Sequence, residues 1–307
     1  MDYAEQAPRY MALVSATPRV EGPQAILEQV YRIGHSELVQ EVILTVGSRR
    51  LDFVSRLHWL EPRTMLRTSF PVAIHAEEAT FEIQYGHIQR PTHRNTTWDL
   101  ARDEVAGHKW VDLSQGDYGV ALLNDCKYGH KVKGNVLDLN LLRSVPYPGA
   151  RVVEDSEGVP GEPHYAYTDQ CEKNVYHSFT YALYPHPGDY LHGGVIRAGY
   201  TLNVPLRTVS VEVHEGSEPR EASFLEIDAE NVIIEAVKKA EDNDDIIIRL
   251  YEAEHKGTSA TLCFGFPVKS VVETNLMEEE LGTLEVQDGA VALTFKPFEI
   301  KTLRVKI

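Results

Sequence analysis

Two short segments hold the polar side chains best suited to binding a ligand. The first covers residues 85–99 (YGHIQRPTHRNTTWD) and the second covers residues 121–129 (ALLNDCKYG). Both follow apolar, strand-like runs, which places their His, Arg, Asn, Trp and Asp side chains where strands end and binding loops usually begin. Such side chains hydrogen-bond hydroxyl groups, and a Trp ring covers the apolar face of a sugar. The pattern predicts a polar recognition surface.

In the first segment, Pro91 interrupts the strand because proline has no backbone N–H with which to continue a ladder. We expect a loop after it, in which Trp98 offers a flat apolar face. His93, Asn95 and Asp99 would supply hydrogen-bond donors and acceptors to hydroxyl groups. The alternative is a polar network that only holds a long loop in place, and on the residues alone this structural interpretation is favoured.

In the second segment, residues 120–123 predict a buried strand that ends in a turn at Asn124 and Asp125, because Asx side chains bond the following backbone. Asp125 and Lys127 could form an acid–base pair, and a turn with a solvated ion pair explains them equally well. Cys126 has a neighbouring cation but no evident base, which argues against a nucleophile.

Composition excludes several classes of function. The 307 residues are 43% hydrophobic and 25% charged, as in globular proteins with a core. A formal net charge of −16 opposes binding to nucleic acid or anionic membranes but leaves neutral sugars unaffected. No CxxC or HExxH pairing occurs, so we expect no metal site within this chain.

The compartment is also predicted from the sequence. The three cysteines, Cys126, Cys171 and Cys263, are far apart and odd in number, which favours reduced thiols over a disulfide framework. The first residues (MDYAEQ) lack the basic and apolar regions of a signal peptide, and no run approaches the ~18 apolar residues of a membrane span. We therefore expect a cytoplasmic protein, or a chain that begins inside a larger protein.

Alternation of apolar and polar residues is the dominant pattern along the chain. It is clearest in residues 51–59, 81–86 and 137–141, each of which predicts a strand with one buried face. Residues 24–32 suit either a short helix or a strand. Asp288-Gly289, between the apolar runs 284–286 and 291–295, predicts a hairpin. Similar strand-like segments are residues 10–15, 38–46, 64–72, 195–203, 232–237 and 246–251.

These patterns predict an all-β protein whose antiparallel sheets stack as sandwiches. Residues 146–163 predict a long surface loop, and residues 211–223 predict a linker. We therefore expect a large β-sandwich domain at residues 1–210 and a small one at residues 222–307, which is long enough to fold as a small domain.

Nine motifs, in a fixed order over nearly the whole chain, carry a resemblance to a known family. They are residues 51–61 (LDFVSRLHWLE), 81–99, 108–114 (HKWVDLS), 118–129, 139–143 (LNLLR), 179–186 (FTYALYPH), 238–241 (KKAE), 249–252 (RLYE) and 297–302 (PFEIKT). In this order and spacing the chain resembles the C-terminal third of glycoside hydrolase family 38, the class II α-mannosidases, and within it the cytosolic branch. Residues 124–129 (NDCKYG) are particularly characteristic of that branch.

The resemblance implies a large antiparallel supersandwich of the galactose-mutarotase type, followed by a smaller C-terminal sandwich. It implies a zinc-dependent retaining glycosidase whose N-terminal catalytic domain supplies the aspartate nucleophile and the zinc ligands. This chain matches none of those motifs, so alone it is expected to be inactive and to hold no cofactor. Its expected partners are that catalytic domain and mannose-containing oligosaccharides, and an exposed docking face would favour homo-oligomers.

The resemblance also places Arg143 at the edge of the sugar site, where a guanidinium would bond hydroxyls or a carboxylate, or form a structural ion pair. The sequence departs from the family after it, because residues 146–170 are longer than the usual connection and only His177 remains of an expected Asp-x-Gly-x-His element. A free-standing carbohydrate-binding module and a self-sufficient enzyme are the competing hypotheses. The expected substrate-binding residues are His93, Asn95, Trp98, Asp99, Asn124, Asp125 and Arg143.

Overall fold

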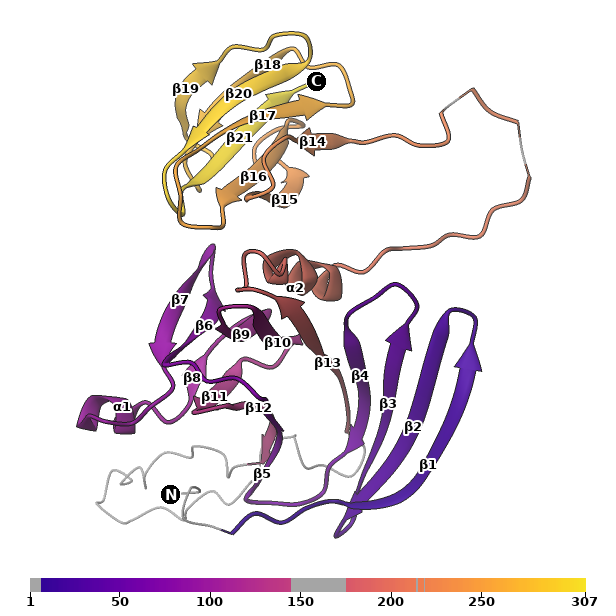
Figure 1. Cartoon of the computed structure of the whole chain (residues 1–307). Helices are drawn as coiled ribbons and strands as arrows, with labels where there is room; N and C mark the ends of the chain where they lie inside the picture. The colour runs from indigo at the N-terminus through magenta and orange to yellow at the C-terminus, as the bar shows by residue number, and fades with distance from the viewer. Residues whose placement is uncertain (1–6, 145–174, 214, 218) are drawn as a thin grey trace, which may run out of the picture. The chain divides into compact units, whose positions relative to one another are not determined.

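The computed structural model describes residues 7–144, 175–213, 215–217 and 219–307. The chain divides into two compact units, of which the first comprises the residues up to Glu82 and Gln89–Pro205. The second comprises Leu206–Ile307 together with Ile83–Ile88, the tip of a hairpin whose strands belong to the first unit. Antiparallel strands dominate both units (Figure 1), which confirms the prediction of an all-β protein.

The first unit is a sandwich of two sheets. Its nine-stranded sheet has, in spatial order, β1 (Ala12–Glu21), β2 (Gln24–Ile33), β3 (Ser36–Thr45), β4 (Leu51–His58), β13 (Tyr176–Pro187), β10 (Tyr118–Asn124), β9 (Trp110–Gln115), β6 (Glu78–Ile83) and β7 (Gly86–Pro91). Its four-stranded sheet has β5 (Thr64–Pro71), β12 (Val136–Ser144), β11 (Gly129–Lys133) and β8 (Val105–Ala106). The unit also contains the helices α1 (Thr97–Ala101) and α2 (Val195–Asn203).

The main core of the first unit lies between its two sheets. The predicted alternation of β12 is confirmed, because Leu137, Leu139 and Leu141 are buried against Val111 and Leu122 of the larger sheet. A smaller apolar cluster on the opposite face of the larger sheet packs Trp110 against Val195 of α2. The larger sheet is therefore covered on both faces near β9, β10 and β13, which keeps these strands rigid.

The second unit is a smaller sandwich with its own core. One sheet has β14 (Leu225–Ile227), β17 (Thr258–Phe264) and β20 (Ala290–Phe295). The other has β15 (Val232–Lys239), β16 (Ile246–Glu252), β21 (Ile300–Lys306), β18 (Ser270–Thr274) and β19 (Glu280–Leu284). Buried side chains of both sheets, such as Leu250 and Leu262, form one cluster. Tyr85, at the hairpin tip that belongs to this unit, meets the Tyr251 ring edge-on at 5.4 Å between ring centroids.

One predicted element is wrong and one forms only in part. Residues 195–203 form α2 rather than a strand, because Val195, Gly199 and Leu202 recur at helical spacing and face the Trp110 cluster. Asp288 and Gly289 make the predicted turn, with φ of 50° and 74°, and Gln287 and Ala290 on either side of it exchange two backbone hydrogen bonds (3.0 and 2.9 Å). The pairing ends at this bridge, because β19 and β20 belong to different sheets. Residues 24–32, which suited either element, lie in β2, and the predicted loop at 146–163 lies outside the described residues.

Candidate functional site

Four of the predicted binding residues, His93, Asn95, Trp98 and Asp99, lie together in the segment that follows β7. The strand ends at Pro91, as predicted, but the expected loop contains the five-residue helix α1. The helix begins with a capping box, in which the Asp99 amide donates to Thr96 Oγ1 (3.1 Å) and the Thr96 amide donates to Asp99 Oδ2 (3.3 Å). The Thr-x-x-Asp spacing is a signal of this helix start that the sequence analysis missed.

Asp99 holds this segment together. Its buried carboxylate accepts the Thr96 hydroxyl (2.7 Å) and pairs with Arg102 (2.8 Å), while His93 Nδ1 lies 3.8 Å from Oδ2. The Thr96 hydrogen bond, more than the Arg102 charge, lowers the pKa of Asp99. Asp99 is therefore an ionised positioning residue, and the side chains free to face a ligand are its neighbours.

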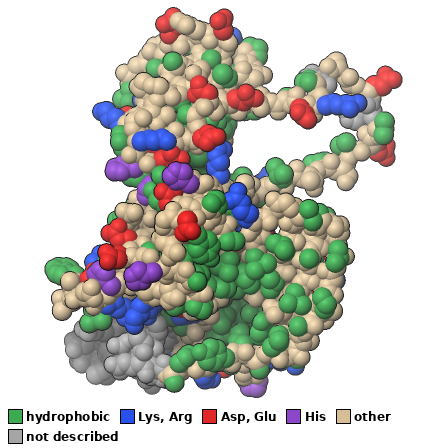
Figure 2. Space-filling model, viewed as in Figure 1, with side chains coloured by type: hydrophobic (Ala, Val, Ile, Leu, Met, Phe, Trp, Pro, Cys, Tyr) green, Lys and Arg blue, Asp and Glu red, His purple; other side chains and the backbone are tan. Residues whose placement is uncertain are grey.

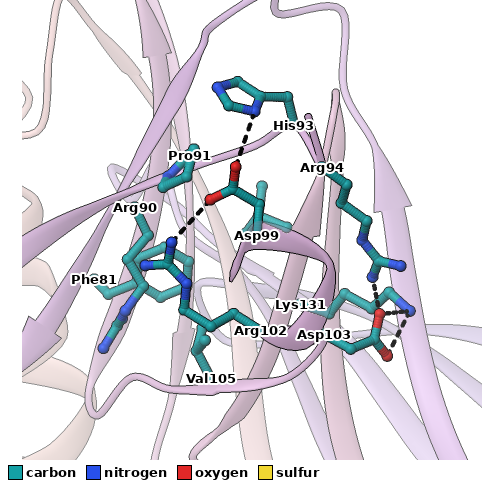
Figure 3. A pocket seen from close by; sticks show the side chains of 11 residues that line it. Phe81, Arg90, Pro91, His93, Arg94, Asp99, Arg102, Asp103, Val105 and Lys131 are labelled. Carbon is teal, nitrogen blue, oxygen red and sulfur yellow. Dashed lines mark hydrogen bonds and ion pairs between the residues drawn. The ribbon is translucent and has the colours of Figure 1, made fainter. Parts of the chain in front are cut away.

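Two cavities adjoin this segment and share His93 and Arg94. The smaller one has a volume of about 30 Å³, room for water-sized groups only, and is lined by β7, α1 and β11. Figure 3 shows Asp99 between His93 and Arg102, and Asp103 facing Arg94 and Lys131. The larger is an open groove of about 1010 Å³ lined also by His75, Gln115 and Asn95. Only the groove has the size of a ligand site for a sugar.

Trp98 and Asn95 are exposed, as a role in binding requires. The Trp98 side chain is 80% exposed on α1, and its ring is free to stack on the apolar face of a sugar. Asn95 lies on the wall of the groove, where its amide can both donate to and accept from hydroxyl groups. These two residues and His93 are the best placed of the predicted set.

Asn124 and Asp125 lie elsewhere, at the end of β10, and line neither cavity. Asn124 is completely buried: its Nδ2 donates to the His108 carbonyl (2.7 Å) and its Oδ1 accepts the Lys127 amide (2.7 Å). Asp125 Oδ2 accepts the Thr180 amide (2.9 Å). The bond from the Lys127 amide is the Asx-type turn that the sequence predicts, whereas the bonds to His108 and Thr180 join this turn to distant parts of the chain. The role of the two residues in sugar binding stays a prediction.

Cys126 and Arg143 are the remaining residues that the sequence analysis considered for a role in chemistry or binding. Burial and the Asp125 carboxylate raise the pKa of the Cys126 thiol to about 12, so the reactive thiolate is suppressed. Arg143, near the end of β12, has an exposed side chain and lines neither cavity. Its contact with a sugar or a carboxylate stays a prediction.

Sequence reasoning missed the charged side chains around the small cavity. Arg90, Arg94, Arg102, Asp103 and Lys131 line it together with His93 and Asp99. The available signal was the density of arginines in residues 90–102 of a chain that is strongly acidic overall.

Among the described residues, no three His, Cys, Asp or Glu side chains lie close enough together to hold a metal ion. None of the helices in the described ranges is both long and apolar enough to cross a membrane.

Comparison with known proteins locates the chain in a family. Residues 3–151 match "Glycosyl hydrolases family 38 C-terminal domain", and residues 231–303 match "Glycosyl hydrolases family 38 C-terminal beta sandwich domain". Among solved structures, an alpha-mannosidase from Enterococcus faecalis aligns over 96% of this chain and 35% of its own, with a TM-score of 0.76 and 18% identity. Another family 38 protein from Enterococcus faecalis aligns with a TM-score of 0.73 and 17% identity over 96% of this chain and 36% of its own.

Curated relatives are more similar in sequence. Alpha-mannosidase 2C1 of Mus musculus is 40% identical over 88% of this chain, and that of Homo sapiens is 38% identical over 88%. Alpha-mannosidase G of Dictyostelium discoideum is 37% identical over 88%. The chain spans only 24% of the length of each of these relatives. The chain belongs to glycosyl hydrolase family 38 and corresponds to the C-terminal region of its members.

Proposed function

We propose that the chain is the C-terminal part of an α-mannosidase that hydrolyses terminal α-mannosides, and that it supports the catalytic region and lines one wall of the sugar site. The observation that carries this proposal is the identity of 37% to 40% with three proteins named as α-mannosidases, over 88% of the chain. The surroundings of α1 support the second part, because His93 and Asn95 line a groove large enough for a sugar and Trp98 of α1 is exposed.

Within the site, Trp98 would stack on the apolar face of a mannose ring, and Asn95 and His93 would hydrogen-bond its hydroxyl groups. Asp99 positions them through the capping box. Arg143, Asn124 and Asp125 are retained as candidates with less support, since they lie outside the segment after β7 that lines both cavities.

The reaction itself is assigned to the part of the enzyme that this chain does not cover. A retaining glycosidase needs two carboxyl groups about 5 Å apart across the scissile bond, and no residue pair of this chain is proposed for that role. Zinc, which family membership implies, would likewise be held by the N-terminal region, where it would polarise the substrate. The chain alone is expected to be inactive.

The proposed partner is therefore the N-terminal region of the longer enzyme, and β1–β3 is its proposed docking surface. Tyr10, Val20 and Val46 are 86%, 78% and 82% exposed on or beside these strands. Figure 2 shows hydrophobic side chains gathered over this part of the sheet. Apolar surface of this extent marks interaction sites, and the relatives have about three quarters of their length outside the matched region to cover it.

The proposed location is the cytoplasm. Cys126 and Cys263 are both free thiols, as expected in a reducing compartment.

A free-standing carbohydrate-binding module is the alternative, favoured by the open groove that His93 and Asn95 line. Two measurements on the purified chain distinguish these two hypotheses. Under the main proposal the chain releases no product from an aryl α-mannoside and binds mannose only weakly by isothermal titration. Under the alternative, mannose or α-mannobiose binds measurably and Trp98→Ala abolishes the binding. Hydrolysis that a chelator stops would contradict both.

A further inference from the structure

The small cavity beside α1 is positively charged in a protein that is otherwise strongly negative. Four cationic side chains line it, and only two carboxylates, Asp99 and Asp103, accompany them, in a chain of formal net charge −16. The cations are Arg90, Arg94, Arg102 and Lys131, and His93 adds a fifth group that can be protonated. A concave site whose charge opposes that of the whole molecule concentrates anions from solution.

The two carboxylates do not occupy all the donors of these cations. Asp103 pairs with Arg94 and with Lys131 (2.9 Å), and Asp99 pairs with Arg102 (2.8 Å). Among the described residues, Arg90 has no carboxylate partner. Its guanidinium lies 4.6 Å from the centre of the Phe81 ring and donates one bond to the Ala106 carbonyl. A guanidinium has five N–H donors, so most of those of Arg90 remain for a ligand.

The pKa values of two of these cations, Arg90 and Lys131, are lowered. Burial lowers the pKa of Arg90, and the positive charge of Arg102 lowers it further. Burial also lowers the pKa of Lys131, followed by the charges of Arg94 and Arg67, although Asp138 and Glu104 oppose them. For both groups burial is the larger cause, and the charges of the neighbouring cations add to it. A bound anion would offset both effects.

We propose that this cavity binds a phosphate group, with Arg90 and Arg102 as its direct ligands and Lys131 and Arg94 adding positive potential. Guanidinium groups match phosphate oxygens in a two-pronged geometry, which makes arginine the preferred phosphate ligand. The cavity admits only water-sized groups, so phosphate oxygens enter it while the rest of a phosphorylated molecule stays outside. His93 and Arg94 also line the open groove, which leaves that groove for the molecule to which the phosphate is attached.

The proposal that the cavity binds phosphate depends only on the charged side chains that line it. The proposal that the phosphate belongs to a sugar rests on the proposed function. Sodium phosphate is titrated into the chain by NMR, against sodium chloride at equal ionic strength, so that screening is the same in both. The proposal predicts saturable shifts at the Arg90 and Arg102 amides with phosphate only. Shifts that chloride reproduces, or that do not saturate, overturn it.

Variants test the assignment of the ligands. Arg90→Gln is expected to weaken phosphate binding about tenfold, as the loss of a charge-assisted hydrogen bond implies. Arg102→Gln should act similarly, and because this side chain is 52% exposed its loss leaves the fold intact. Arg32→Gln removes an equal charge from β2, where Arg32 pairs with Glu37, and should leave affinity within about twofold. Equal effects of all three variants would overturn the site.

The affinities of mannose-6-phosphate, inorganic phosphate and mannose identify the source of the phosphate. Mannose-6-phosphate that binds more tightly than inorganic phosphate, with the gain lost in Asn95→Ala, supports a phosphorylated sugar lying in the groove. Equal affinities, unaffected by Asn95→Ala, support free phosphate in the same cavity. Mannose that binds as tightly as mannose-6-phosphate overturns the phosphate pocket while leaving the proposed function intact.

Discussion

At the scale of single residues, the polar side chains divide into those that hold the structure and those that face outward. Asp99, Asn124 and Asp125 form bonds to backbone amides or carbonyl groups, or to the Thr96 hydroxyl, and act by fixing turns. Trp98 and Asn95 point to solvent. The sequence shows both kinds as polar residues in loops, because residue type alone does not tell which hydrogen bonds are satisfied within the chain.

Removing the Thr96 cap is expected to loosen α1. Thr96→Ala deletes the acceptor for the Asp99 amide, and loss of such a cap costs about 1 kcal/mol. The Asp99 and Leu100 amides should then exchange with solvent about fivefold faster in hydrogen-exchange NMR. Thr97→Ala, one position on, removes a hydroxyl that is not the cap and is the control. Equal exchange in both variants would show that the capping box does not hold the segment.

His130 is expected to make stability depend on pH. It is completely buried, and burial followed by the charge of Arg67 lowers its pKa from 6.5 to about 3. Below about pH 6.5 the unfolded chain takes up a proton that the folded chain refuses, so this group contributes stability that falls with decreasing pH until about pH 3. The expected contribution is about 1.4 kcal/mol per pH unit within that window.

The measurement is the free energy of unfolding in urea between about pH 6 and about pH 4, inside that window, for the wild type and His130→Gln. The free energy of unfolding of the variant should fall less per pH unit than that of the wild type, and the difference should be about 1.4 kcal/mol, the contribution of one proton. Val132→Ala, on the same strand, lowers stability without removing a titratable group and should keep the wild-type slope. An unchanged slope in His130→Gln would mean that His130 is protonated in the folded protein.

At the scale of elements, the sequence predicts strands well wherever one face is buried. The alternation in β4 and β12 predicted both strands to within one residue or a few, because Ser55 and Leu57 of β4 and Leu137, Leu139 and Leu141 of β12 are buried at alternate positions. The alternation failed for α2, where a nine-residue segment with Val195, Ile196 and Leu202 fits either period and only the Trp110 cluster decides. The cationic cavity was missed because the residues that line it run from Phe81 in β6 to Val132 in β11, 51 positions apart in the sequence.

Within the β9–β10 hairpin, Gly119 is expected to resist substitution. A Cβ there would lie 2.2 Å from His186 Cε1, and the ring cannot move away because its Nε2 bonds Asp112 Oδ1 (2.7 Å) and Gly193 closes its other side. Gly119→Ala should lower the free energy of unfolding by about 1–3 kcal/mol, as overpacking in cores does. Gly116→Ala in the same hairpin meets nothing within 4 Å and is the control. Equal urea midpoints would contradict this packing.

At the scale of the whole molecule, the described chain has two separate cores, and the domain division at residues 1–210 and 222–307 remains a proposal. Leu122 lies in the core of the first unit and Leu250 in that of the second, and both are completely buried. Each truncation to Ala should cost about 2–5 kcal/mol. Calorimetry should show two transitions, with Leu122→Ala lowering one and Leu250→Ala the other. A single transition, lowered equally by both, would contradict independent unfolding of the two units.

The central claim is that this chain serves as the C-terminal part of an α-mannosidase. The most direct measurement is the hydrolysis of an aryl α-mannoside by a chimera that joins this chain to the N-terminal region of the Mus musculus relative, which is 40% identical to it. We expect the chimera to be active, and the N-terminal region alone and this chain alone to be inactive. Trp98→Ala in the chimera should lower kcat/KM about tenfold, because it removes one aromatic stacking contact. A folded chimera without activity, or full activity of the N-terminal region alone, would contradict the central claim.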